Sequence, residues 1–141
     1  MKTFDLIKQY KIFEKDINKR VLKVLSSGSY ILGQNVKSFE NNARKYLATR
    51  YTVSCNSGTD ALVMSLRALN IGSNDQVITT PFTYFATSEA ISLVGAIPIF
   101  ADINPHTFNI NPKKIEKLIS KKTKAILSVN LFGQACELDK I

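Results

Sequence analysis

The residues best suited to chemistry lie between a stretch of strand-forming residues and a helical pattern. The segment Asn56–Asp60 follows a β-like run, Tyr51–Cys55, and opens the helical pattern. A turn of small residues at a helix start leaves backbone N–H groups without intrahelical partners, and the helix dipole adds partial positive charge there. Gly58 has no Cβ to block a phosphate, and the hydroxyls of Ser57 and Thr59 add donors. The pattern therefore predicts an anion cradle for a phosphate-bearing cofactor or substrate.

A second interpretation of this segment stays open. Ser, Thr and Asp are the ordinary N-cap residues, so the same turn could do no more than begin a helix. The segment is neither a Walker loop, since no lysine follows Gly58, nor a dinucleotide-binding fingerprint, since it holds one glycine.

A second segment, Pro81–Thr87, places three aromatic residues among threonines after a strand-like run. An aromatic ring beside a phosphate cradle can stack on a planar heterocycle. For Tyr84 stacking and burial in the core are equally open. For Phe85 we expect burial in the core.

The hydrophobic pattern predicts an α/β fold. Strand-like and helix-like runs alternate as three successive strand–helix–strand units, which is typical of a parallel sheet covered by helices, with ligands beyond the carboxyl ends of the strands. Two amphipathic helices precede them, and residues 1–50 form an N-terminal helical segment. The expected strands are Tyr51–Cys55, Gln76–Thr80, Ile97–Ile103 and Ala125–Leu131, and the expected helices are 6–25, 36–47, Ala61–Leu69, Ala86–Val94 and Pro112–Ser120.

Composition argues against several classes of function. The net charge of +8 raises the question of nucleic acid, but the lysines are dispersed and the one cluster, Lys121–Lys124, falls in an expected turn. Cys55 and Cys136 lack metal-ligand spacing, so no metal site is expected, and we expect Cys55 to be buried in a strand. The single histidine, His106, lies in an expected turn. No apolar leader is visible at the N-terminus, which indicates a cytoplasmic protein.

Six motifs stand in a characteristic order along nearly the whole chain. With them the sequence resembles the N-terminal portion of the DegT/DnrJ/EryC1/StrS family, pyridoxal-phosphate-dependent nucleotide-sugar aminotransferases of fold type I. The motifs are Tyr30–Gly33, Asn56–Leu62, Pro81–Thr87, Gly95–Ile103, Thr123–Ile126 and Leu131–Gln134.

The resemblance implies roles for individual residues. Gly58, Thr59 and the N–H of Asp60 would hold the phosphate of pyridoxal 5'-phosphate, with Ser57 in support. Tyr84 would stack on the pyridine ring. Tyr30 and Gly33 would lie near the substrate mouth. One position departs from the family pattern, because Asn130 stands where a histidine is frequent and an amide cannot titrate near neutral pH.

The resemblance also implies what lies outside the printed sequence. The Schiff-base lysine and the acidic residue that protonates the pyridine nitrogen would both lie beyond Ile141, so no catalytic residue is assigned here. We expect residues 51–141 to be the first part of the large cofactor-binding domain, without a small C-terminal domain. The intact enzyme would use an amino donor such as glutamate and a nucleotide-linked keto-sugar in surface-polysaccharide synthesis, and would be a homodimer. The motif combination is most similar to enzymes that aminate a 3-keto UDP-linked N-acetyl-hexuronic acid.

Three rival interpretations remain at this point. In a related branch a histidine replaces the lysine, and the enzyme dehydrates a deoxysugar. The chain could also be a short product without catalytic activity, with an exposed sheet edge. The third rival is a basic α/β module that binds nucleic acid.

Overall fold

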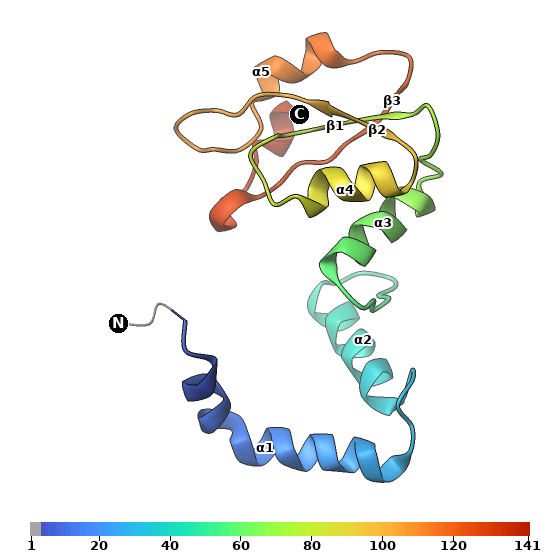
Figure 1. Ribbon diagram of the computed structural model, residues 1–141, viewed down its shortest axis with the longest axis vertical. Coiled ribbons are helices and arrows are strands. Elements are labelled where there is room, and N and C mark those ends of the chain that lie inside the picture. Colours follow the sequence, from blue (N-terminus) through green and yellow to red (C-terminus); the bar gives the residue numbers. More distant parts are fainter. Residues whose placement is uncertain (1–3) are drawn as a thin grey trace. The chain divides into compact units, whose positions relative to one another are not determined.

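The computed structural model describes residues 4–141 and is shown in Figure 1. The chain divides into two compact units, Met1–Ser54 and Cys55–Ile141. No helix within the described part of the chain is both long enough and apolar enough to cross a membrane.

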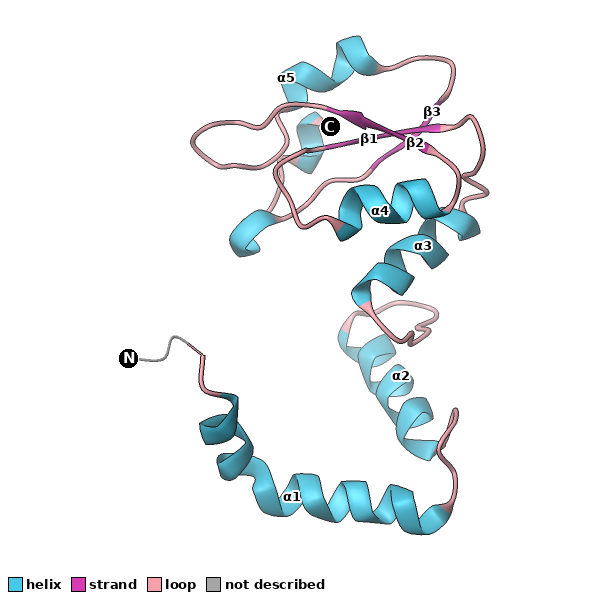
Figure 2. Cartoon of the chain, viewed as in Figure 1, coloured by secondary structure: helices cyan, strands magenta, loops and turns pink. Residues whose placement is uncertain are grey.

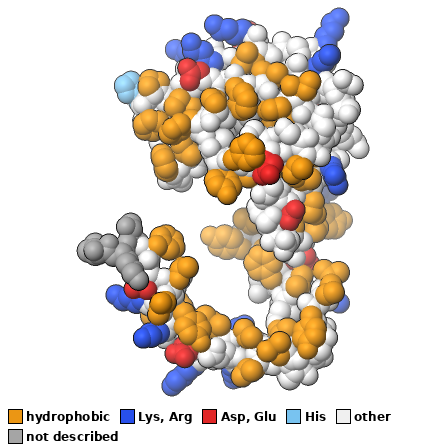
Figure 3. Space-filling view, in the orientation of Figure 1, with side chains coloured by type: hydrophobic (Ala, Val, Ile, Leu, Met, Phe, Trp, Pro, Cys, Tyr) orange, Lys and Arg blue, Asp and Glu red, His pale blue; other side chains and the backbone are white. Residues whose placement is uncertain are grey.

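The first unit consists of two helices, α1 (Leu6–Ser27) and α2 (Gln34–Tyr46). The carboxylate of Asp5 accepts a hydrogen bond from the N–H of Lys8 at 3.0 Å and caps the beginning of α1. Gly28 ends α1 in the left-handed conformation, at φ 65°, which costs a glycine little. Both helices were expected from their spacing, and neither contains a buried residue. Apolar side chains therefore line their surfaces (Figure 3).

The second unit is built on a sheet of three parallel strands in the order β2-β1-β3. Helices lie between the strands along the chain, as parallel pairing requires (Figure 2). The elements in chain order are α3 (Gly58–Ala68), β1 (Gln76–Thr79), α4 (Ala86–Leu93), β2 (Ile97–Phe100), α5 (Pro112–Ile115), the 3-10 turn η1 (Glu116–Leu118), β3 (Thr123–Ile126), and the 3-10 turns η2 (Leu131–Gly133) and η3 (Leu138–Lys140).

Helices cover both faces of this sheet. Val77 of the central strand packs in a core with Leu66 of α3 and Ile91 of α4. The next residue, Ile78, points to the opposite face and packs with Ile115 of α5 and its neighbours. Figure 1 shows α3 and α4 on one side of the strands and α5 on the other. The second unit is a three-layer α/β/α arrangement, which is the predicted fold class.

The predicted strand at Tyr51–Cys55 is wrong, because this stretch is an irregular loop. A strand needs a neighbour to satisfy its N–H and C=O groups, and none of the described strands pairs with it. Cys55 is accordingly exposed rather than buried. As a result the described sheet holds two strand–helix–strand units where the pattern predicted three.

The remaining elements overlap their predicted ranges, with shorter strands. The strand predicted at Ala125–Leu131 is shifted, because β3 begins at Thr123 and ends at Ile126. The third predicted strand stops at Phe100, and Ile103 instead forms an isolated antiparallel bridge with Ile110. The predicted helix over Pro112–Ser120 is a single α-turn continued by the 3-10 turn η1. Lys121 and Lys122 form a turn, as expected.

Candidate ligand-binding edge of the sheet

The first turn of α3 is closed by two of its own residues. The N–H of Asp60 donates to the hydroxyl of Ser57 at 3.1 Å, and this hydroxyl donates to a carboxylate oxygen of Asp60 at 2.9 Å. The C=O of Ser57 accepts from the N–H of Ala61 at 3.0 Å. Ser57 is therefore an N-cap, and the Asp60 carboxylate lies at the positive end of the helix dipole. Two of the predicted phosphate ligands, the Ser57 hydroxyl and the Asp60 N–H, bind each other.

The two residues between them leave free donors. Neither the N–H groups of Gly58 and Thr59 nor the Thr59 hydroxyl forms a hydrogen bond with any residue of the range 4–141. A Cβ built on Gly58 would have no atom within 4 Å, so the space above this backbone is open. The arrangement can accept a phosphate or carboxylate oxygen at Gly58 and Thr59, and an added methyl group would occupy the same space.

Threonines fix the aromatic loop that follows β1. The hydroxyl of Thr80, a buried residue, accepts from the N–H of Phe82 at 3.2 Å. The hydroxyls of Thr83 and Thr87 share a hydrogen bond of 3.0 Å, which ties the loop to the first turn of α4. Between these ties Tyr84 projects outward and is 82% exposed. Its ring is therefore available to a ligand at the carboxyl end of β1.

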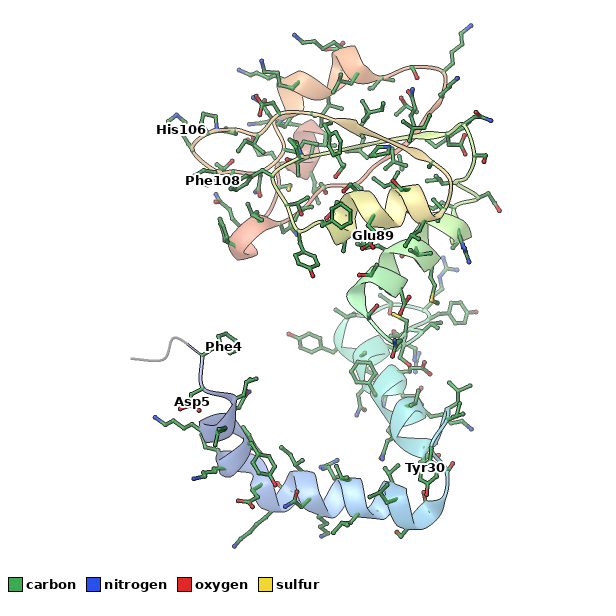
Figure 4. All side chains as sticks on the ribbon, viewed as in Figure 1. Phe4, Asp5, Tyr30, Glu89, His106 and Phe108 are labelled. Atoms are coloured by element: carbon green, nitrogen blue, oxygen red, sulfur yellow. The ribbon has the colours of Figure 1, made fainter. Side chains whose placement is uncertain are left out.

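The expected burial of Phe85 is wrong, since its side chain is 71% exposed. Phe85 occupies the N-cap position of α4, where its C=O accepts from the N–H groups of Ser88 and Glu89. The aromatic that does pack is Phe82, whose ring lies 5.6 Å from the ring of Phe108 at an angle of 31°. Phe108 lies on the loop that follows β2 (Figure 4).

A buried asparagine holds the loop that follows β3, and sequence reasoning missed it. Asn109 is 5% exposed. Its Nδ2 donates to the C=O groups of Gln134 and Ala135, both at 3.1 Å. Its Oδ1 accepts from the N–H of Leu131, also at 3.1 Å. A polar residue between Phe108 and Ile110 was the available signal, since a buried amide must find partners.

Asn130, at the position where the family pattern often has histidine, also holds the loop that follows β3. Its Oδ1 accepts from the N–H of Cys136 at 2.9 Å, and the Cys136 thiol donates to the C=O of Val129 at 3.1 Å. Both ends of the 130–136 loop are thereby held together. The amide of Asn130 has a structural role that needs no titration.

His106 lies in an exposed turn, as predicted from its neighbours. Its N–H donates to the Asn104 side chain at 2.9 Å, which is an Asx-turn contact. Figure 4 shows His106 at the tip of the loop between β2 and α5. This turn explains why Asn104 stands two residues before His106.

The predicted substrate segment Tyr30–Gly33 belongs to the first unit. It lines a hollow of about 250 Å³ between the end of α1 and the beginning of α2. The Tyr30 hydroxyl donates to the C=O of Leu25 at 3.0 Å, which occupies a free carbonyl at the end of α1 (Figure 4). A Cβ on Gly33 would lie 2.8 Å from the C=O oxygen of Ser29, so only glycine fits this turn.

Topology brings two loops and the beginning of α3 to one side of the second unit. The strands are parallel, so the loops after β1 and β3 both leave from the carboxyl edge. Helix α3 packs beside α4 and runs in the direction opposite to β1, so it begins on the side of the unit at which β1 ends (Figure 1). A phosphate cradle at the beginning of a helix and an exposed aromatic ring are thus parts of the same edge.

These motifs and this fold are shared with known proteins. Residues 11–141 match the DegT/DnrJ/EryC1/StrS aminotransferase family. The chain belongs to this family. The UDP-2-acetamido-2-deoxy-3-oxo-D-glucuronate aminotransferase of Pseudomonas aeruginosa is 41% identical over 137 residues, which are 97% of this chain and 38% of that protein.

Solved structures of family members have the same fold. DesV of S. venezuelae, in complex with a ketimine intermediate, superposes with a TM-score of 0.93 at 35% identity, over 96% of this chain and 37% of its own. NtdA of Bacillus subtilis, with bound cofactor PMP, superposes with a TM-score of 0.88 at 38% identity. The match covers 90% of this chain and 29% of the NtdA chain. The predicted fold is confirmed. The chain spans less than two fifths of the length of the family members it matches here.

Proposed function

We propose that the chain is the cofactor-anchoring part of a pyridoxal-phosphate-dependent sugar aminotransferase. The intact enzyme would transfer an amino group from glutamate to a keto group of a nucleotide-linked sugar in surface-polysaccharide synthesis. The observation that carries this proposal is the match of residues 11–141 to the family, together with the open donors at the beginning of α3.

Each residue of the edge has a stated part in the proposal. The N–H groups of Gly58 and Thr59 and the Thr59 hydroxyl would bind the cofactor phosphate. Ser57 and Asp60 would hold the first turn of α3 in the shape that aims these donors outward. Tyr84 would lie against the pyridine ring. When bound, pyridoxal phosphate supplies an electron sink for the carbon beside the amino nitrogen.

We infer the substrate from the name of a relative. The Pseudomonas aeruginosa relative carries the name of an aminotransferase for a 3-oxo UDP-sugar acid. We extend a substrate of this kind, a 3-keto UDP-linked N-acetyl-hexuronic acid, to the intact protein, with Tyr30 and Gly33 near the substrate mouth. The hollow beside these two residues is in keeping with that role. We further propose a cytoplasmic homodimer.

The first experiment is to sequence the encoding DNA past the codon for Ile141. The proposal expects an open frame with an acidic residue and then a Ser-x-x-x-x-Lys-like motif. A histidine in place of that lysine would favour the dehydratase. A stop codon directly after Ile141 would remove the catalytic claim for this polypeptide.

The second experiment tests the phosphate ligands in the encoded protein. Thr59→Ala should weaken pyridoxamine phosphate binding about tenfold, because a hydrogen bond to a charged group is lost, and Thr59→Ser should restore most of it. Equal dissociation constants for the wild type and Thr59→Ala, measured by calorimetry, would count against this assignment.

A further inference from the structure

Two exposed aromatic residues, Tyr84 and Phe132, lie in the loops that follow two neighbouring strands, β1 and β3. Ile78 of β1 is paired with Ile126 of β3. Tyr84 lies six residues after Ile78, and Phe132 lies six residues after Ile126. Their side chains are exposed to nearly the same degree, 82% and 84%. The loops that carry the two rings therefore leave the sheet at the same carboxyl edge, which is where ligands bind in parallel sheets.

The backbone at Phe132 is in a conformation that its residue type disfavours. Phe132 has φ 54° and Gly133 has φ 81°. The left-handed region suits glycine but brings the Cβ of an L-residue close to the following carbonyl. A bulky residue persists in this region only where the surrounding structure holds it. The turn around Phe132 thus needs an external clamp.

Asn109 supplies this clamp from another segment of the chain. Its three hydrogen bonds reach residues on both sides of Phe132: Leu131 before it, and Gln134 and Ala135 after it. The amide is almost fully buried, so these bonds are not shared with bulk water. The outcome is a fixed turn whose most exposed large side chain is Phe132.

We propose that Phe132 is a second ligand-contacting residue beside Tyr84, and that Asn109 is the positioning residue that holds it there. The ligand class is a planar heterocycle that carries a phosphate, with the phosphate at Gly58 and Thr59. This inference rests on the proposed function, since it places a second ring against the proposed cofactor. It differs from that function in assigning Phe132 and Asn109, to which the resemblance gives no role.

The test uses pyridoxamine 5'-phosphate and inorganic phosphate as probes of the full encoded protein. Pyridoxamine phosphate forms no Schiff base with a protein lysine, so its binding does not depend on one. Calorimetry gives dissociation constants for Phe132→Ala, Phe132→Tyr, Asn109→Ala and the double variant. Tyr46→Ala is the matched control, because Tyr46 is 89% exposed in the first unit. Circular dichroism checks that each variant is folded.

The expected results separate ring contact from general damage. Phe132→Ala should weaken pyridoxamine phosphate binding about fivefold, which is the size of an aromatic contact, and leave inorganic phosphate unchanged. Phe132→Tyr should restore the affinity, and Tyr46→Ala should not alter it. Asn109→Ala should reproduce the loss, and the double variant should be no weaker than either single variant, because both changes remove the same contact.

Three outcomes would contradict the inference in whole or in part, and they are distinguishable. If the wild type binds pyridoxamine phosphate and Phe132→Ala binds it equally well, Phe132 does not contact the ring, and the proposed cofactor site is unaffected. If the wild type binds neither probe, the proposed cofactor site fails and this inference fails with it. A loss in Asn109→Ala that adds to the loss in Phe132→Ala would assign Asn109 to the fold rather than to positioning.

Discussion

Ser57 and Asp60 form two reciprocal hydrogen bonds at the beginning of α3. The Asp60 N–H donates to the Ser57 hydroxyl at 3.1 Å, and the hydroxyl donates back to the Asp60 carboxylate at 2.9 Å. This reciprocal pair explains how one segment can be both an ordinary helix cap and a ligand site. The cap uses the outer residues of the turn and leaves the donors of Gly58 and Thr59 free.

The first prediction concerns the cap. Ser57→Ala removes the acceptor for the Asp60 N–H and should lower the free energy of unfolding by about 1 kcal/mol, the usual cost of losing an N-cap. Urea unfolding followed by circular dichroism measures this change. Ser65→Ala is the control, since the Ser65 hydroxyl only bonds the C=O of Ala61 within the same helix. An equal effect of both changes would contradict the capping role.

The second prediction separates binding from stability at Gly58. Its φ lies outside the left-handed region and a Cβ would meet no atom within 4 Å, so alanine fits the folded chain. Gly58→Ala should leave the free energy of unfolding unchanged or raise it by about 0.5 kcal/mol, because alanine loses less chain entropy. The added methyl group should weaken pyridoxamine phosphate binding about tenfold, by displacing charged hydrogen bonds. Calorimetry and urea unfolding on the same variant check both expectations.

Unchanged pyridoxamine phosphate affinity in Gly58→Ala would be the contrary result. It would mean that no phosphate approaches this backbone. The Ser57 turn would then be an N-cap and nothing more, which is the second interpretation that the sequence leaves open.

The third prediction concerns Tyr84, whose ring contributes little to the folded core because it is 82% exposed. Tyr84→Ala should therefore change the free energy of unfolding by less than about 0.5 kcal/mol. It should weaken pyridoxamine phosphate binding about fivefold and alter the absorption spectrum of the bound ring, and Tyr84→Phe should keep both. Phe85→Ala is the neighbouring control, since Phe85 is also exposed and has no assigned contact. The stacking role is refuted if Tyr84→Ala leaves spectrum and affinity unaltered.

The sequence predicted those features that depend on local patterns. The helix predicted at Ala61–Leu69, which the structure has at Gly58–Ala68, is such a feature, since its cap residues and its hydrophobic spacing lie within a few positions. The parallel sheet followed from the alternation of strand-like and helix-like runs. The threonine-flanked Tyr84 was recognised at a strand end, although its exposure was left open.

The features that sequence reasoning missed depend on partners far along the chain. Tyr51–Cys55 has strand-forming residues, but a strand exists only where a neighbour pairs with it. Phe85 is a residue type that is usually buried, yet it stands at the N-cap of α4 and its side chain is exposed. Asn109 bonds residues 22 to 26 positions away, and no local pattern reveals such contacts.

The last prediction concerns the pH dependence of a carboxylate in the first unit. The backbone N–H of Ser54 donates to Glu40 at 2.9 Å and the Ser54 hydroxyl donates at 2.8 Å. Both bonds favour the charged form and lower the pKa of Glu40 below the ordinary value of a glutamate, and the backbone N–H has the larger effect.

A carboxylate whose pKa is lowered by folding contributes stability above the ordinary pKa, and this contribution is lost as the pH falls through the lowered value. Ser54→Ala should therefore raise the pKa of Glu40 toward its ordinary value, measured by NMR titration of the side-chain carboxyl carbon. Ser26→Ala, which removes a hydroxyl bonded to the C=O of Lys23, should leave the pKa of Glu40 where it is. An identical Glu40 titration in Ser54→Ala and the wild type would mean that the backbone N–H alone lowers this pKa.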